Sequence, residues 1–245
     1  MKRSAVNAII REAAAFLAKY HVALPPFAKW DIASWRAAQA SGTIDEIIDA
    51  QLGWDITDFA RGDFAKFGLV LFTVRNGVPA STAADAAKRH GGKSYCEKVM
   101  VCRPGQMTPM HFHWHKMEDI ICRAGAPLVL QLYNARKDNE ELDLESDVAV
   151  SIDGVRRVVK AGSEVVLTPG ESITLPPYLY HRFWAQPTAD NEPCLIGEVS
   201  LVNDDDKDNR FAEPLARFPA LEEDEPPAYL ITKDYGKFVV SPVTA

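Results

Sequence analysis

Between residues 68 and 202 the sequence consists of short runs rich in β-branched and aromatic residues, separated by Gly, Pro and Asn. Runs of this length and composition predict strands, and ten of them at close spacing predict a sandwich or small barrel. The predicted strands are residues 69–74, 96–102, 106–112, 120–122, 128–133, 148–152, 156–159, 164–167, 172–175 and 195–202. The fold class that follows is mainly β.

The residues before this region predict helices. Apolar residues recur at helical spacing over residues 4–20, which indicates an amphipathic helix packed on a core. A second short helix is expected to begin near Asp31 or Ser34. A third should follow Thr43, which begins a capping-box pattern, and should end at Gly53.

The end of the chain is rich in Asp, Glu and Pro, and a short helix is expected near residues 214–217. We therefore expect a single domain over residues 1–245. Its parts would be a helical N-terminal extension (1–60), a β-barrel core (68–202) and a C-terminal extension that packs on the barrel (203–245).

Charge and cysteine content restrict the classes of partner. The 245 residues carry a formal net charge of −7, which argues against a nucleic-acid or anionic-membrane surface because such surfaces need clustered Lys and Arg. The four cysteines form no C-x-x-C pair, and no apolar run approaches the ~18 residues of a membrane span. We expect a cytoplasmic protein that binds a small neutral or sugar-like molecule.

Three histidines stand at alternate positions in residues 108–120, which read TPMHFHWHKMEDI. On a strand, His111 and His113 would share one face with Cα atoms about 6.6 Å apart, so both could hold one ion. Glu118 would lie roughly 16 Å from His113 on a straight strand, so it is a ligand only if the chain reverses between them. The reversal would place His115 in the turn. The alternative is a pair of ordinary surface or core histidines.

The wider spacing resembles the first motif of the cupin superfamily. Five residues separate Gly105 from His111, His113 follows two positions later, and Glu118 is followed after six residues by Gly125. The resemblance implies a jelly-roll barrel, also called a double-stranded β-helix, with a bound metal ion.

A second cupin motif is matched downstream. Gly170 and Pro176 stand where cupins place a glycine turn and a proline, and His181 stands where they place the last histidine ligand. Tyr178 and Ala185 replace the usual second Gly and terminal Asn, which puts only the local turn geometry in doubt. The resemblance thus implies four metal ligands: His111, His113, Glu118 and His181.

Nitrogen and hard oxygen ligands without thiolate suit Mn²⁺, Fe²⁺, Co²⁺, Ni²⁺ or Zn²⁺, and the ligand set alone does not choose among them. The cysteines are poor candidates for ligands. Cys122 is expected to be a small buried apolar residue.

Longer blocks of the chain resemble the D-lyxose isomerase family of cupins, and the HWHKMED block is much more specific than the cupin motif alone. The matching blocks are residues 52–59, 68–77, 97–98, 107–120 and 208–211. The resemblance implies an aldose–ketose isomerase that interconverts D-lyxose and D-xylulose, and also D-mannose and D-fructose, by proton transfer through a cis-enediol. It further implies Mn²⁺ as the usual metal and a homodimer.

Candidate catalytic residues surround these motifs. Lys116 lies between two expected ligands and is a candidate proton donor or oxyanion stabiliser. Glu213 is the favoured general base because it follows the matching block 208–211, and Glu198 is its rival. Lys98 and Arg210 are candidates for contacts with sugar hydroxyls. Lys116 could instead be an ordinary exposed lysine of the turn, and Glu213 a solvent-facing acid of the acidic tail.

Two other functions fit the same motifs, since the cupin scaffold hosts many activities. One is an Fe²⁺-dependent cupin dioxygenase, and the other is a sugar-binding cupin without catalysis. Whether the protein is an isomerase or a sugar-binding protein, we expect it to prefer free sugars over sugar phosphates. The sequence has no phosphate-binding loop and no cluster of arginines.

Overall fold

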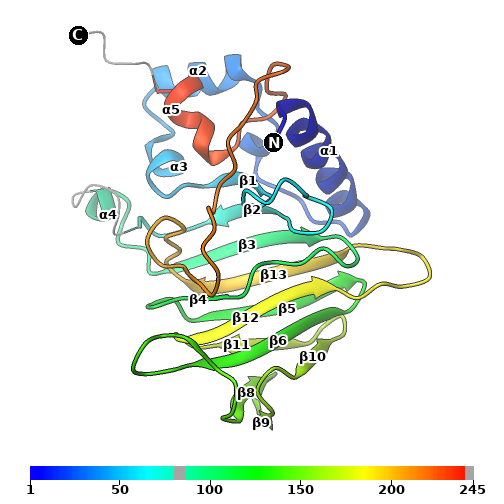
Figure 1. Cartoon of the computed structure of the whole chain (residues 1–245). Coiled ribbons are helices and arrows are strands. Elements are labelled where there is room, and N and C mark those ends of the chain that lie inside the picture. Colours follow the sequence, from blue (N-terminus) through cyan, green and yellow to red (C-terminus); the bar gives the residue numbers. More distant parts are fainter. Residues whose placement is uncertain (80–85, 241–245) are drawn as a thin grey trace.

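The computed structural model describes residues 1–79 and 86–240 (Figure 1). The helices are α1 (Arg3–Lys19), α2 (Ile32–Ala40), α3 (Asp45–Asp49), α4 (Ala86–Arg89) and α5 (Tyr235–Phe238), with 3₁₀ turns at Pro26–Lys29 and Thr232–Asp234. The strands are β1 (Gly53–Thr57), β2 (Leu69–Arg75), β3 (Tyr95–Cys102), β4 (His111–Phe112), β5 (Glu118–Gly125), β6 (Leu128–Ala135), β7 (Leu142–Asp143), β8 (Val148–Ile152), β9 (Val155–Val159), β10 (Glu164–Leu167), β11 (Ser172–Leu175), β12 (Leu179–Ala185), β13 (Cys194–Leu201) and β14 (Arg210–Phe211).

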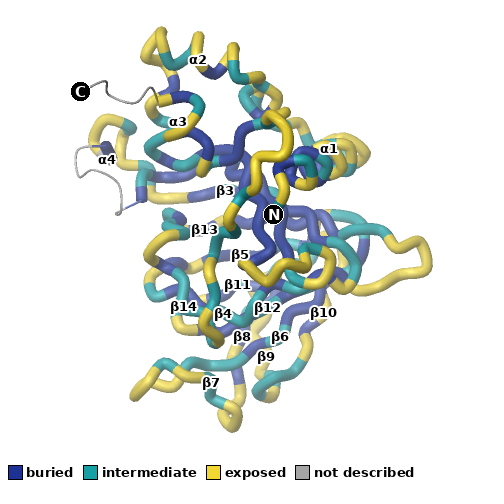
Figure 2. Tube along the Cα trace, turned by 45° about the horizontal axis from the view of Figure 1, so that its top comes forward, coloured by how far each residue is buried: buried dark blue, intermediate teal, exposed yellow. Residues whose placement is uncertain are grey.

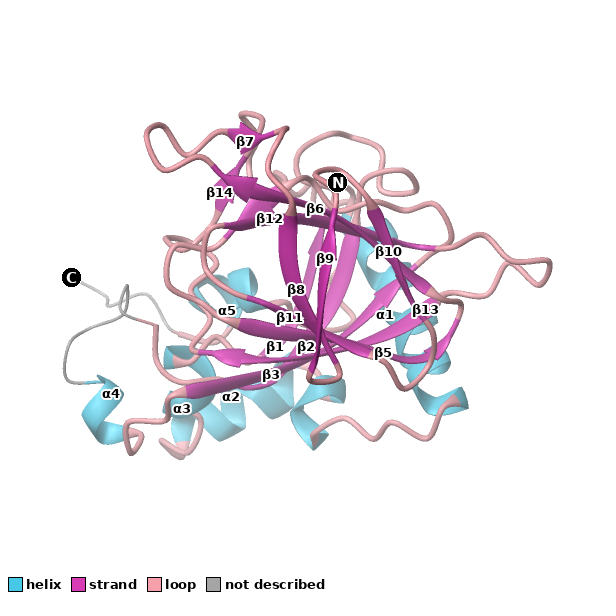
Figure 3. Cartoon of the chain, turned by 90° about the horizontal axis from the view of Figure 1, so that it is seen from below, coloured by secondary structure: helices cyan, strands magenta, loops and turns pink. Residues whose placement is uncertain are grey.

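Two antiparallel sheets curl around a common interior (Figure 3). The larger sheet has the order β1-β2-β3-β13-β5-β11-β8-β9, and the smaller has the order β10-β6-β12-β4-β14, with β7 beside β6. Neighbouring strands come from distant parts of the sequence, as β13 lies between β3 and β5. The arrangement confirms the predicted mainly β, cupin-like barrel.

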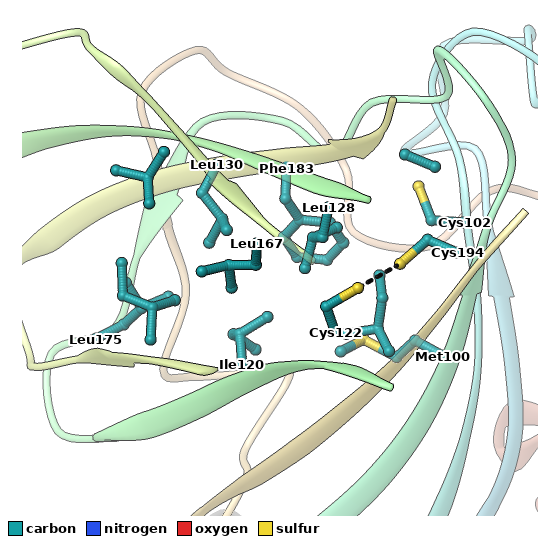
Figure 4. Packing of buried hydrophobic residues seen from close by; sticks show 14 of the residues in the cluster. Met100, Cys102, Ile120, Cys122, Leu128, Leu130, Leu167, Leu175, Phe183 and Cys194 are labelled. Atoms are coloured by element: carbon teal, nitrogen blue, oxygen red, sulfur yellow. Dashed lines mark hydrogen bonds between the residues drawn. The ribbon is translucent and has the colours of Figure 1, made fainter. Parts of the chain in front are cut away.

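Side-chain alternation along β3, β5 and β13 gives the barrel an apolar end and a polar end. At the apolar end Cys122 and Cys194 are fully buried among leucines, with their sulfur atoms 3.8 Å apart (Figure 4). Further along the same strands, Lys98, Glu118 and Glu198 take the inward positions, because residues an even number apart share a face. Cys122 is thus the buried apolar residue that was predicted.

The helices cover one outer face of the larger sheet (Figures 1 and 3). The apolar side of α1, including Val6 and Ile10, packs against Val70 and Phe72 on the outer face of β2. Figure 2 shows the result as buried strands beneath helices whose outer sides are exposed. None of the helices in the described residues is long and apolar enough to cross a lipid bilayer.

Four strands of the described residues were not predicted: the two-residue strands β7 and β14, and the longer strands β1 and β12. β1 lies within the expected helical extension. Both of its faces are buried, so polar and apolar residues do not alternate in its sequence GWDIT and no pattern predicts a strand there. β12 alternates well, but its inward positions include a histidine, which breaks the apolar pattern. The predicted strand over residues 106–112 is reduced to β4, because the backbone of Met107 and Thr108 bonds to Lys66 and Phe183 outside a regular ladder.

The helix predictions were mostly correct. Helices α1 and α2 form as expected, and the Asp31 side chain caps α2 by accepting from the Ser34 amide. The Thr43 capping box is absent: Thr43 contacts Ser41 and the Ala38 carbonyl, and α3 begins without a side-chain cap. Residues 214–217 form no helix: the segment is irregular, and Leu215 packs against the barrel core.

Candidate metal centre and active site

The polar end of the barrel contains a cavity lined by residues of both sheets and of the C-terminal segment. We call it the barrel cavity. Its apolar lining comes from the strands and from Phe59 and Phe211. Its polar lining residues are Lys98, Thr108, His111, His113, Lys116, Glu118, His181, Glu198, Asp205, Asn209 and Arg217.

Three histidines converge in the barrel cavity. His111 on β4 and His181 on β12 are direct partners across two paired strands, and His113 follows at the end of β4. One ring nitrogen from each of the three lies within 4.8 Å of the others. Glu118 begins β5 after the chain has reversed, and its Oε1 lies 3.1 Å from His181 Nε2 and 3.4 Å from His113 Nε2.

Each histidine is held by its other ring nitrogen. Nδ1 of His111 is 2.8 Å from the Pro109 carbonyl, and Nδ1 of His181 is 3.0 Å from the Leu179 carbonyl. Nδ1 of His113 is 2.6 Å from the carbonyl of Asp208. Carbonyl groups accept only, so these contacts place the proton on Nδ1 and leave Nε2 as a lone-pair donor toward the centre, which is the arrangement of metal-binding imidazoles.

Burial favours the neutral form of His111 and His113, and a neutral imidazole is the form that binds a metal cation. Burial lowers the pKa of His111 well below its ordinary value, and the neighbouring His181 and His113 add to this. Burial also lowers the pKa of His113, with the charge of Lys116 acting in the same direction. Neutral imidazoles beside an ionised carboxylate fit a divalent first-row metal ion, whose ligand atoms lie about 3 Å apart when each bond is about 2.1 Å.

His115 does not belong to this group. Its side chain is exposed in the turn between β4 and β5, and its amide donates to Asp208 Oδ1. The amide of Lys116 donates to the other oxygen of the same carboxylate, at 2.9 Å. Asp208 therefore fixes the turn from which the Lys116 side chain enters the cavity.

A buried network of opposite charges adjoins the histidines. Lys116 Nζ lies 2.7 Å from Glu118 Oε2 and 3.0 Å from Glu198 Oε1, which ties the candidate metal centre to β13. Lys98 Nζ lies 3.4 Å from the same Glu198 oxygen and donates to Asn203 Oδ1 at 2.6 Å. Lys98, Lys116, Glu118 and Glu198 are all less than 5 % exposed.

The network keeps Lys116, Glu118 and Glu198 charged. Burial opposes the charged form of Lys116, but Glu118 and Glu198 outweigh it and raise the pKa of the ammonium. Burial likewise opposes ionisation of Glu198, but Lys116 and Lys98 outweigh it and lower the pKa of this carboxyl. The same balance, with Lys116 as the main opposing charge, lowers the pKa of Glu118. At neutral pH the site thus contains a proton donor beside an ionised carboxylate.

Two predicted residues lie outside the barrel cavity. Glu213, the favoured base, is on the surface, with its side chain 73 % exposed and paired with Arg61 at 2.6 Å, so the structure does not place it in the cavity. Arg210 does not line the cavity either: its guanidinium donates to the Phe211 carbonyl and approaches Glu140. For Glu213, closeness to block 208–211 was a poor guide, because the chain leaves the cavity after Phe211 and lines it again only at Arg217.

Sequence reasoning missed several residues of the C-terminal segment. Asp205 and Arg217 line the cavity, and Asn203 bridges the two lysines by accepting from Lys98 and from Lys116 at 3.2 Å. Asp205 follows and precedes other acids, so it read as part of a solvated tail. Asp205 differs from the neighbouring acids in what it packs against. Burial opposes its ionisation, but the charges of Lys98 and Arg217 outweigh burial and hold its pKa well below the ordinary value.

Comparison with known proteins agrees with this site. A family model described as D-lyxose isomerase matches residues 1–235. The D-lyxose/D-mannose isomerase of Serratia proteamaculans is 46 % identical over 98 % of this chain and 100 % of its own, and that of Escherichia coli O157:H7 is 47 % identical over 97 % and 100 %. The L-ribose isomerase of Acinetobacter sp. DL28 shares the fold, with a TM-score of 0.56 at 16 % identity over 91 % of this chain and 98 % of its own. The chain therefore belongs to the D-lyxose isomerase family.

Proposed function

We propose that the protein is a metal-dependent aldose–ketose isomerase that interconverts D-lyxose and D-xylulose, and also D-mannose and D-fructose. The proposal rests on two groups of residues that lie close together in one buried cavity. A three-histidine, one-carboxylate donor set lies beside a Lys116–Glu198 pair at 3.0 Å. The names of the relatives, D-lyxose/D-mannose isomerase, support the same reaction.

His111, His113, His181 and Glu118 would hold the metal ion, for which we propose Mn²⁺. Their nitrogen and oxygen donors are equally suitable for Fe²⁺, Co²⁺, Ni²⁺ and Zn²⁺, so the choice rests on the family resemblance. A bound divalent cation would supply Lewis-acid polarisation of the sugar's carbonyl and adjacent hydroxyl oxygens.

The isomerisation moves one proton between C2 and C1 through a cis-enediol, and Glu198 is our candidate for the base in place of Glu213. Glu198 is ionised, buried and aimed into the cavity by hydrogen bonds from Lys116 and Ser200, each at 3.0 Å. Lys116, as a protonated donor, would stabilise the oxygen that becomes negative. Lys98, on the far side of Glu198, would contact a sugar hydroxyl.

The charges of the barrel cavity favour neutral sugars over sugar phosphates. Its three cations, Lys98, Lys116 and Arg217, are each paired with buried carboxylates at 3.4 Å or less. A phosphate would have to compete with these carboxylates, since no positive charge in the described lining is left over.

We further propose one domain over residues 1–245, a homodimer and a cytoplasmic location, with a sugar as the partner and no nucleic acid or membrane. The exposed edge strand β9, with Val155 and Val158 more than half exposed, supports association of two copies. Light scattering of the purified protein measures the mass and tests the dimer.

The proposed activity is tested by removing metal with a chelator, restoring Mn²⁺ and assaying ketose formation. D-lyxose and D-mannose should be converted and D-mannose 6-phosphate should not. The assay is run without oxygen, which an isomerase does not need and a dioxygenase does. Absence of ketose with every divalent metal would reject the isomerase.

A further inference from the structure

Lys98 and Glu198 are side chains of opposite charge that stand directly across from each other on paired strands, yet the lysine is closer to a third residue. The two are Cα partners in the ladder between β3 and β13, and both line the barrel cavity. The Lys98 Nζ lies 3.4 Å from Glu198 Oε1, whereas it lies 2.6 Å from the amide oxygen Oδ1 of Asn203. The cation is thus held closer to a neutral group than to the carboxylate that faces it.

Electrostatics alone would favour the opposite arrangement. Opposite charges directly across an antiparallel pair attract, and a carboxylate is a stronger acceptor for an ammonium group than an amide oxygen is. Both side chains are less than 5 % exposed, so water and salt screen the attraction only weakly. A fixed Asn203 is needed to keep the ammonium of Lys98 away from Glu198.

Asn203 is fixed by a second asparagine, Asn76, which follows β2. The Asn203 amide donates to Asn76 Oδ1 at 2.9 Å, and Asn76 Nδ2 donates to the Asn203 carbonyl at 3.0 Å. Asn76 Nδ2 also donates to the carbonyl of Ala50 at 3.2 Å, and both asparagines are buried. The main chain of residue 203 is therefore held at two points, and its side chain starts from a fixed position.

The position of Lys98 depends on Asn203 more than the position of Lys116 does. An ammonium group has donors only, so the oxygen of the Asn203 amide must face both lysines. This oxygen accepts from Lys116 at 3.2 Å, but Lys116 is held mainly by Glu118 and Glu198, at 2.7 and 3.0 Å. Among the described residues, the nearest carboxylate to Lys98 is that of Glu198, at 3.4 Å.

We propose that Asn203 is a positioning residue, whose amide oxygen holds the Lys98 ammonium back from Glu198 and so leaves this carboxylate able to accept a proton from the sugar. This role rests on the proposed function, in which Glu198 is the base. Glu198 Oε1 already accepts from Lys116 and Ser200, and a further ammonium bonded to the carboxylate would weaken it as a base. Asn203 is not among the described lining residues of the cavity, so it acts through Lys98 and not by contact with the sugar.

A double-mutant cycle tests whether Asn203 acts through Lys98. Asn203→Leu keeps the approximate shape of the side chain but removes the acceptor, so kcat/KM for D-lyxose should fall by roughly 10- to 100-fold, the value of one hydrogen bond to a charged group. In the Lys98→Met background the same substitution should change kcat/KM by less than about threefold, because no ammonium is left to displace. A general disturbance of the fold would instead lower kcat/KM equally in both backgrounds.

Asn7→Leu is the matched control, because Asn7 is a buried asparagine whose side chain joins α1 to the C-terminal segment at Glu225 and Pro226. Its kcat/KM should match that of wild type. If Asn203→Leu does not fold, Asn203→Ala takes its place. The smaller side chain leaves room for a water that accepts from Lys98, so the loss should be smaller and should show the same dependence on Lys98.

A measurement without turnover separates this role from the proposed function: crystal structures of wild type and of the Asn203 variant, both grown with Mn²⁺. In wild type the Lys98 ammonium should remain on the Asn203 oxygen, and in the variant it should move to about 2.8 Å from Glu198. This movement supports the positioning role even if wild type isomerises no aldose, in which case the proposed function alone fails. An unmoved Lys98 in the variant, or equal losses of kcat/KM with and without Lys98, would overturn it.

Discussion

Two buried arginines of this protein differ in how their donors are used. Arg3, at the start of α1, is fully buried and donates to both Glu223 and Asp234, so it fastens the N-terminal helix to the C-terminal segment. Arg217 lines the barrel cavity and leaves Nη1 without a partner. The comparison shows that the Arg3 guanidinium is fully paired within the chain, whereas the Arg217 guanidinium at the cavity has one nitrogen without a partner among the described residues.

The largest expected effect is on the cavity side of this comparison. Glu198→Gln removes the proposed base but keeps its shape, so kcat should fall by about 10³-fold with bound metal unchanged. Glu213→Gln is the matched control because that carboxylate is on the surface, and its kcat should remain within about twofold of wild type. Steady-state kinetics with metal analysis decides, and a greater loss in the Glu213 variant would restore the prediction from the sequence.

On the structural side, Arg3→Met should leave the buried carboxylate of Asp234 without its cation, while the partly exposed Glu223 keeps Lys237 at 2.9 Å. The free energy of unfolding should fall by about 3–5 kcal/mol, measured by urea denaturation. Arg11→Met changes an exposed arginine on the same helix and should shift it by no more than about 0.5 kcal/mol. Loss of kcat in folded Arg3→Met without loss of stability would contradict the assignment of Arg3 to the stability of the fold and of the barrel cavity to catalysis.

A smaller effect should connect the two regions, because Asp208 of the C-terminal segment caps the turn that carries His113 and Lys116. Asp208→Ala removes the carboxylate that accepts from two amides, so affinity for Mn²⁺ should fall by about 10-fold. Competition with a fluorescent chelator measures it. Asp206→Ala, two residues away in an exposed pair with Lys233, should bind Mn²⁺ as wild type does, and equal affinities in both variants would show that the cap is unnecessary.

The smallest expected effect is the pH dependence of the stability that the Arg3–Glu223 ion pair contributes. The hydrogen bond from Arg3 lowers the pKa of Glu223 from 4.5 to about 2, so this contribution to stability is complete above about pH 4.5 and is lost as the pH falls toward 2. Because the Glu223 side chain is one-third exposed, we expect about 1 kcal/mol. Urea denaturation near pH 5 and near pH 3 should show this loss in wild type and a smaller one in Arg3→Met, where only Lys237 still pairs with Glu223. The same acid dependence in both would assign it to other carboxylates.

Local patterns in the sequence were sufficient for most of the barrel and for placing His111 beside His113, whereas His181 was identified only by the resemblance to cupins. Short β-branched runs identified β2, β3, β8, β10 and β11 closely. The spacing of His111, His113 and Glu118 required a reversal of the chain, and the structure has that reversal, with Glu118 at the first position of β5. These features depend on residues that are close together in the sequence, so a local sequence pattern is enough to predict them.

The rest of the site depends on strand pairing. Lys98 faces Glu198 only because β13 is inserted between β3 and β5, and no local signal specifies that insertion. Asp205 and Arg217 come from an irregular segment without periodicity, so their burial depends on what the segment packs against. Glu213 was favoured for its closeness in sequence to block 208–211, and that closeness did not place it in the cavity.

The most direct test of the central claim, that Glu198 transfers a proton in the barrel cavity, is turnover of D-lyxose in D₂O by the Mn²⁺-loaded protein, with NMR detection of deuterium at C1 of the ketose. We predict deuterium at C1 in the product of wild type and almost no product from metal-loaded Glu198→Gln in the same time. Ketose carrying only protium at C1, or formed by the Glu198 variant at the wild-type rate, would contradict proton transfer by this residue.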